Sequence, residues 1–212
     1  ITGRIKGSNA SPGGEIAFYS GIDGGAMVQN LILDSNSRIS LSNNDSGADN
    51  TVFGMYAGAA LASGGDDNTI IGDNAATGLT TGSNNIAIGS GAFDAAVDDE
   101  SWNVAIGVNA MGACDQGSHA SADIDDNVAI GYNALLGGDL GSGNVNVTQN
   151  VVVGYNAMDG TGSVGGNNNV FMGAYSGGGS WAAESNWNVA VGHNTMTGAL
   201  NDADNNTAVG TA

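Results

Sequence analysis

The sequence predicts an all-β protein, a parallel β-solenoid or β-roll of about nine coils with 17–24 residues each, and two observations support this fold class. A motif of Asn, a β-branched residue, two apolar residues and Gly recurs nine times in 212 residues at nearly constant intervals. These intervals are too short for helix pairs or propeller blades, and they fit one short strand per coil. The second observation is the composition, because 37 Gly residues leave no long stretch with the 3.6-residue period of a helix.

Each copy of the motif begins with an Asn and ends with a Gly. The Gly is expected to permit a tight bend or a positive φ at the end of the strand. We interpret both residues as structural parts of the repeat, which require no ligand. The repeat residues are Asn50, Gly54, Asn68, Gly72, Asn85, Gly89, Asn103, Gly107, Asn127, Gly131, Asn150, Gly154, Asn169, Gly173, Asn188, Gly192, Asn206 and Gly210.

The three residues between Asn and Gly are expected to form the strand, with alternate side chains on opposite faces. They are apolar or Thr in every copy, so both faces of the strand are expected to be buried. One coil encloses only one face, and a second copy of the chain would cover the other. A three-fold axis keeps all chains parallel, so the sequence predicts a parallel homotrimer. The small middle residues are expected to face the trimer axis or a neighbouring chain: Ala87, Ala105, Ala129, Ala190 and Ala208.

The residues after the Gly are expected to turn and then to supply an interior plug. Asn, which tolerates left-handed backbone, stands two residues after the Gly in five of the copies. The rest of each coil is rich in Gly, Ser, Asp and Thr, which is typical of turns. An apolar residue four positions after the Gly is expected on a second short strand of the coil: Phe93, Met111, Leu135, Met158 and Met196.

Residues 1–47 lack the repeat and are expected to form a strand-rich N-terminal shaft or connector segment, whereas residues 48–212 form the solenoid. The stretches EIAFYSG, MVQNLILD and SRISLSN indicate three strands, with turns at Gly24-Gly25 and Ser35-Asn36. The chain starts without Met and stops within a repeat. We therefore expect an internal piece of a longer polypeptide whose repeats continue.

Charge divides the chain near residue 38. The basic residues Arg4, Lys6 and Arg38 all precede residue 39, and residues 39–212 contain 18 of the 21 acids and no Lys or Arg. Such a surface repels phosphate backbones, which argues against nucleic acid as a partner. No apolar run approaches the ~18 residues of a membrane-spanning helix, so no membrane span is expected.

Carboxylates lie just before several of the repeat Asn residues, at the coil corners at positions 66–67, 98–100 and 125–126. They are expected to form solvated turns with local hydrogen bonds. Oxygen ligands also suit hard cations, so weak Ca²⁺ binding at these acidic corners is an alternative, and no other metal or cofactor is expected. Adjacent carboxylates on one strand cannot flank a glycosidic bond, so we expect no catalytic residues and no enzyme.

Five single residues are candidate sites. Cys114 is alone, so no intrachain disulfide can form, and we interpret it as a small buried or loop residue. No nucleophile and orienting acid accompany His193, so a catalytic role is not expected. Trp102 and Trp187 directly precede a repeat Asn, where they either cover a coil edge or serve as stacking platforms for sugar. Both Trp residues and His119 are the candidate receptor contacts.

Two coils are longer than the others. Their inserts, at about 112–126 and 136–149, are expected to bulge as surface loops, because insertions in solenoids map to loops on one face. Binding residues concentrate on loops that a rigid scaffold positions, so these inserts are the expected place of any receptor contact.

Several stretches resemble known families. The stretches GGEIAFYSG and LILDSNSRISLSNNDSG, with the NTVFG that follows, are similar to tail-fibre proteins of tailed bacteriophages, in which strand segments precede arrays of such repeats. The stretches SNNIAIGSGA and NVAIGYNA also resemble the head repeats of trimeric autotransporter adhesins, which are left-handed parallel β-rolls wound as trimers. The intervals are longer and less uniform than in the adhesin repeat, which favours the phage fibre.

The resemblance implies a structural and adhesive segment of an extracellular trimeric fibre, a virion tail fibre that attaches to a host-surface glycan or protein. The alternative is the head of an autotransporter-type adhesin on a bacterial cell surface. A glycan-depolymerising tailspike ranks below both, because no coil is enriched in inward-facing acids. An ice-binding solenoid would need a regular Thr ladder, and only scattered residues such as Thr77, Thr80 and Thr81 occur.

Overall fold

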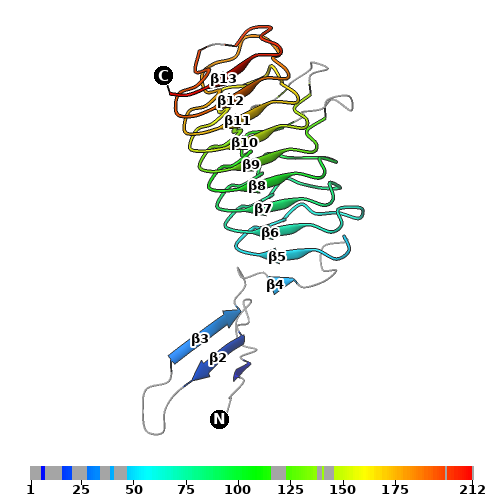
Figure 1. The fold of residues 1–212 in the computed structure, drawn as a ribbon. Coiled ribbons are helices and arrows are strands. Elements are labelled where there is room, and N and C mark those ends of the chain that lie inside the picture. The colour runs from blue at the N-terminus through cyan, green and yellow to red at the C-terminus, as the bar shows by residue number, and fades with distance from the viewer. Residues whose placement is uncertain are drawn as a thin grey trace.

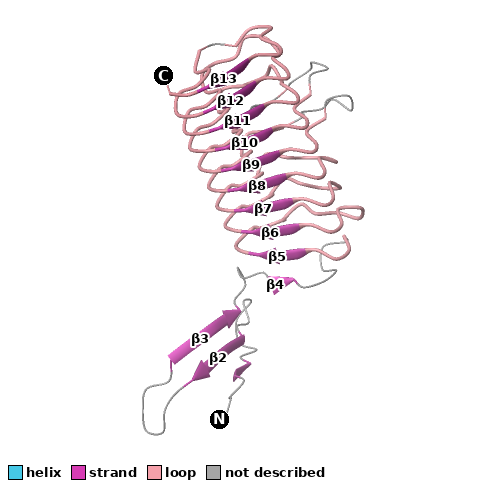
Figure 2. Ribbon diagram, viewed as in Figure 1, coloured by secondary structure: helices cyan, strands magenta, loops and turns pink. Residues whose placement is uncertain are grey.

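The computed structural model consists of strands and turns, with no helix in the residues that it describes (Figure 2). The all-β prediction is therefore confirmed for this part of the chain. The structure describes residues 6–7, 16–20, 28–33, 39–40, 47–115, 123–137, 140, 146–198 and 200–211.

Thirteen short strands in the described residues form a three-stranded and a ten-stranded sheet. The strands are β1 (Lys6–Gly7), β2 (Ile16–Ser20), β3 (Val28–Leu33), β4 (Ile39–Ser40), β5 (Thr51–Phe53), β6 (Thr69–Ile71), β7 (Ile86–Ile88), β8 (Val104–Ile106), β9 (Val128–Ile130), β10 (Val151–Val153), β11 (Val170–Met172), β12 (Val189–Val191) and β13 (Thr207–Val209).

Strands β5 to β13 are parallel, and each pairs with the next one along the chain to form a stack of coils (Figure 1). Each strand has three residues and starts directly after a repeat Asn, as predicted. The pairing is in register, so Val128 of β9 lies beside Val151 of β10. The parallel β-solenoid is thus confirmed. At ~4.8 Å per step, eight steps give a stack about 38 Å long.

Eight of the nine repeat Asn residues are buried, all except Asn206, and they link each coil to the next. The side-chain Nδ2 of Asn127 donates to the carbonyl oxygen of Val147 at 2.7 Å, and its Oδ1 accepts from the backbone N of Asn150 at 3.1 Å. Asn68 makes the equivalent bonds to the carbonyl of Gly82 and from the backbone N of Asn85. A buried amide without such partners would cost about 1–3 kcal/mol. These bonds form a ladder of Asn side chains along the stack. The ladder explains why Asn recurs at this position of the repeat.

The repeat Gly has a φ between 127° and 145° in all nine copies, a conformation that L side chains rarely adopt. Neighbouring coils also approach closely here. A Cβ added to Gly131 would lie 2.4 Å from the carbonyl oxygen of Gly154. Backbone conformation and stacking distance therefore both require Gly at this position.

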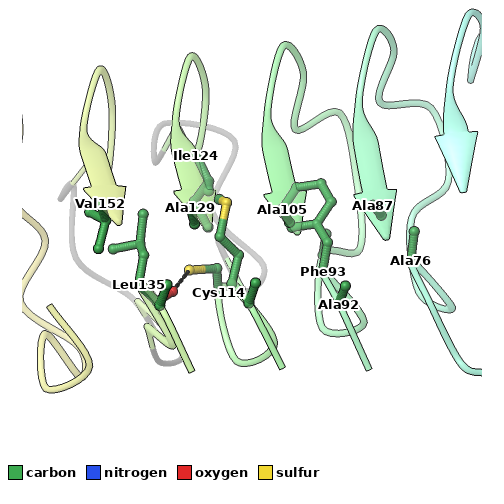
Figure 3. Close-up of a cluster of buried hydrophobic side chains, with 14 of the residues drawn as sticks. Ala76, Ala87, Ala92, Phe93, Ala105, Cys114, Ile124, Ala129, Leu135 and Val152 are labelled. Atoms are coloured by element: carbon green, nitrogen blue, oxygen red, sulfur yellow. Dashed lines mark hydrogen bonds between the residues drawn. The ribbon is translucent and has the colours of Figure 1, made fainter. Parts of the chain in front are cut away.

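The middle residue of each strand points into the coil of its own chain. Figure 3 shows Ala105, Ala129 and Val152 on their strands, with Phe93 and Leu135 reaching toward them from the opposite side of the coil. The prediction that the alanines face a trimer axis or a neighbouring chain is wrong, because Ala105 and Ala129 have 0 % exposed surface in a single chain. Small residues are needed here because the interior of one narrow coil must also hold the larger plugs.

Four of the five predicted plug residues are fully buried and Met196 is partly buried, but the prediction of a second strand is wrong. Phe93, Met111, Leu135 and Met158 are fully buried and lie in turns. These four plugs and Met196 have φ between 47° and 56°. So short a coil must change direction several times, and left-handed residues provide those changes. The turns still bond from coil to coil, as between the backbone N of Met111 and the carbonyl of Ala134 at 3.0 Å.

The N-terminal segment contains strands in each of the three stretches where they were predicted. β2 pairs antiparallel with β3, and β1, which was not expected, pairs antiparallel with β2. β4 pairs antiparallel with β5 and so covers the backbone edge of the first coil. The turns expected at 24–25 and 35–36 lie outside the described residues.

Candidate interaction surface

The outward sides of β5 to β13 form one continuous face, here called the strand face. Alternation in each strand sends the middle residue inward and the first and third residues outward. No charged residue occurs in any of these nine strands. The strand face consists of Thr51, Phe53, Thr69, Ile71, Ile86, Ile88, Val104, Ile106, Val128, Ile130, Val151, Val153, Val170, Met172, Val189, Val191, Thr207 and Val209.

The exposed apolar side chains of the described residues gather on the strand face and its two edges. All fifteen large hydrophobic residues that are strongly exposed lie there, and the remaining described surface has none. The stack is about 38 Å long, and seven residues across span about 20 Å, so the strand face and its two edges together cover roughly 800 Å². The starting edge is mostly polar, but a concentration of exposed large hydrophobic residues on one side of a protein is typical of an interaction site. The face is therefore a candidate interaction surface.

The starting edge of the strand face is the residue directly before each repeat Asn. This residue has a left-handed backbone in all nine coils, with φ between 54° and 61°. In seven of the nine coils, the residue at this position is Asp, Asn or Gln. The exceptions are Trp102 and Trp187, whose side chains are 59 % and 55 % exposed. A bulky residue in this conformation is an outlier, because short polar side chains are the ones that tolerate it. Neither the backbone conformation nor packing in the core explains why Trp stands at these two positions.

The ending edge of the strand face is formed by residues one or two positions after each repeat Gly. Tyr132 and Tyr155 stack here with ring centroids 5.2 Å apart. Tyr175 packs edge-on against Tyr155 at 5.4 Å and against His193 at 6.1 Å. Proximity to Tyr175 also raises the pKa of the Tyr155 phenol. Sequence reasoning missed this exposed aromatic row, although alignment of the repeats places Tyr132, Tyr155 and His193 at one position.

The acidic corners use some of their carboxylates to stack the coils. Oδ1 of Asp66 accepts from the backbone N of Ala48 at 2.7 Å, and Oδ1 of Asp125 accepts from the backbone N of Ser101 at 2.7 Å. Burial raises the pKa of Asp125. Among the described residues, no three His, Cys, Asp or Glu side chains are grouped so that they could hold a metal ion.

Among the described residues, two titratable groups are buried inside the solenoid. The carboxylate of Glu100 is buried and accepts hydrogen bonds from the backbone N of Asp98 at 3.0 Å and of Val97 at 3.3 Å. Burial raises its pKa. Cys114 is also buried, and its Sγ contacts the carbonyl oxygen of Leu135 at 3.4 Å (Figure 3). Burial raises the pKa of this thiol, which keeps it protonated and unreactive.

The candidate receptor contacts are not brought together in the described residues. Trp102 and Trp187 lie four repeats apart along the starting edge, and His119 lies outside the described residues. Much of the two inserts, 116–122, 138–139 and 141–145, lies outside them as well, so the loops stay a prediction. Their described ends are tied into the stack, since the backbone N of Leu140 donates to the carbonyl of Asp115 at 2.9 Å.

Comparisons of the chain with protein-family models, curated proteins and solved structures find no match. The described residues also contain no helix long and apolar enough to cross a bilayer. The repeat and the strand face are therefore the features that indicate a function.

Proposed function

We propose that this chain is a structural and adhesive segment of an extracellular trimeric fibre, of the kind found in phage tail fibres. In this role the solenoid is a stiff shaft, and three parallel copies bury their strand faces against one another. Attachment to a host-surface glycan or protein is a property of the assembled fibre.

The strand face is the single observation that carries the proposal. It continues over all nine repeats, has no charged residue in its strands and carries exposed aromatic residues on both edges. The periodic polar residues support the same role, because the Asn ladder and the corner carboxylates bond to the adjacent coil. The phage origin is supported by the sequence resemblance alone.

Sedimentation equilibrium of the chain tests the proposed assembly. We expect a mass three times the 20.8 kDa of one chain, at micromolar concentration and physiological salt. A folded, soluble monomer under these conditions would rule out the trimeric fibre. Binding of the assembled chain to intact bacterial cells, compared with a variant whose strand face is charged, then tests the adhesive part.

A further inference from the structure

We propose that the starting edge of one copy packs against the ending edge of the next, with residues of the same repeat meeting each other. Trp187 then packs on His193 of the partner subunit, and Trp102 packs on Val108 of the partner subunit. This inference rests on the proposed fibre function and adds the pairing that joins the copies.

The pairing of unlike edges follows from the direction of the strands. In a ring of parallel copies around an axis along the stack, every strand runs the same way around the ring. The end of each strand therefore approaches the start of the strand in the next copy. Closed rotational symmetry includes no shift along the axis, so each repeat meets the same repeat of its neighbour. Trp187 and His193 both belong to the eighth repeat, and Trp102 and Val108 both belong to the fourth.

The side chains along the two edges match at this register. The fifth, sixth and seventh repeats carry the exposed phenols Tyr132, Tyr155 and Tyr175 on the ending edge. The starting edge has a hydrogen-bonding side chain at each of these levels, namely Asp126, Gln149 and Asn168. A phenol can pack its ring on a partner and still bond through its hydroxyl.

The second repeat is the level at which two carboxylates, Asp67 and Asp73, would meet across the contact. Both are exposed in a single chain, and their repulsion across the contact weakens the pairing at this one level. The eighth repeat gives the strongest pairing, because Trp187 and His193 are exposed rings on opposite edges.

A second copy of this chain is the occupant that fits the strand face. The partner must present an uncharged apolar strip with a ~4.8 Å period over about 38 Å, and the chain itself does so. The strand face with its two edges covers roughly 800 Å² per chain, and in a ring of three each chain divides this area between two neighbours. The area buried per chain in the whole assembly is then comparable to what one partner contributes to a standard interface. The two Trp residues would then occupy the desolvated positions where Trp contributes most to binding.

Cysteine cross-linking between copies tests the register. Two matched double variants, Trp187→Cys with His193→Cys and Trp102→Cys with Val108→Cys, pair edges at one level. Two mismatched variants, Trp187→Cys with Val108→Cys and Trp102→Cys with His193→Cys, place the thiols four repeats apart, about 19 Å. The extended strand keeps the two edges of one chain more than about 10 Å apart, beyond the reach of a disulfide. Any disulfide between them is therefore intermolecular.

The expected result is covalent trimer after mild oxidation of the matched variants, at least roughly tenfold more than from the mismatched ones. Native Cys114 is buried, so the unmodified chain is the control that stays uncross-linked. Cross-linking of all four variants, or of none, in a sample that sediments as a trimer would overturn the edge pairing alone. A monomeric mass would instead reject the proposed fibre assembly.

A second measurement does not depend on introduced thiols. Trp187→Asn places at this edge the residue that Asn168 and Asn205 provide in the adjacent repeats. We expect the dissociation constant of the trimer to rise roughly tenfold or more, since Trp residues at the centre of contacts dominate binding. Ser163→Ala, an exposed residue away from both edges, is the control and leaves assembly within about threefold. Equal effects of the two changes would contradict the pairing.

Discussion

The two sides of the same nine strands differ in their burial and in the residues that they carry. On the inward side, Ala129 and the repeat Asn127 are fully buried within one chain, and the first eight coils all bury the equivalent two residues. On the outward side, Ile130 is exposed, and the residues vary among Thr, Val, Ile, Phe and Met without losing apolar character. The inward side is complete in a single chain, whereas the outward side is not. We therefore assign folding of the coil to the inward side and assembly to the outward side.

The largest effect is expected from a charge on the inward side. Ala129→Glu would bury a carboxylate against Leu135 and Val152 without a partner, at a cost of several kcal/mol. We expect loss of the β-sheet circular dichroism spectrum at 25 °C. Ala129→Val is the matched control, because Val152 occupies the same position in the next coil. It should cost about 1–3 kcal/mol at most. A folded Ala129→Glu protein would contradict the inward placement.

A smaller loss is expected when the Asn ladder is interrupted. Asn127→Ala removes the bond to the carbonyl of Val147 and the bond from the backbone N of Asn150. Two buried groups lose their partners, so urea denaturation should show a free energy of unfolding lower by about 2–4 kcal/mol. The control is Asn84→Gly, an exposed Asn with φ 61° on the starting edge, and it should change stability by less than about 0.5 kcal/mol. Equal losses from the two variants would mean that the ladder is not the source of stability.

The buried carboxyl of Glu100 gives a pH-dependent effect. Burial raises its pKa in the folded state above 4.5, so the folded protein favours the protonated form. This contribution to stability is fully present below pH 4.5 and is lost as the pH rises through the folded-state pKa. The free energy of unfolding of the native chain, relative to Glu100→Gln, should therefore fall between pH 4 and pH 8. A difference that stays constant over this range would show that the carboxyl does not titrate differently on folding.

The sequence predicts the fold well because the repeat interval and the Asn-to-Gly motif together specify one strand per coil. It does not reveal which side of the strand faces inward. The side chain of Asn127 is polar, so the sequence suggests that it is exposed. Its hydrogen bonds allow it to be buried instead, and Ala129, two residues later, lies on the same inward side. The sequence also predicts a second strand at the plug residues, where the structure has a turn. Phe and Met usually avoid a positive φ, so the residue types at Phe93 and Met111 give no sign of this turn.

The candidate site was predicted only in part. Trp102 and Trp187 stood out as aromatic residues before a repeat Asn, but their relation to the strand face requires the stacked coils. The row of Tyr132, Tyr155 and Tyr175 joins residues about 20 positions apart, which only the stacking brings to one edge. Tyr175 also stands one position later in its repeat than the other two.

The most direct test of the division between the two sides is the sedimentation mass of Ile130→Glu beside that of the native chain. Ile130 is exposed on the strand face, so the charge stays in water in a single chain but would be buried in the assembly. We predict an unchanged circular dichroism spectrum, a mass of 20.8 kDa for the variant and three times that mass for the native chain. A variant that unfolds, or one that sediments with the same mass as the native chain, would contradict the assignment of the outward side to assembly.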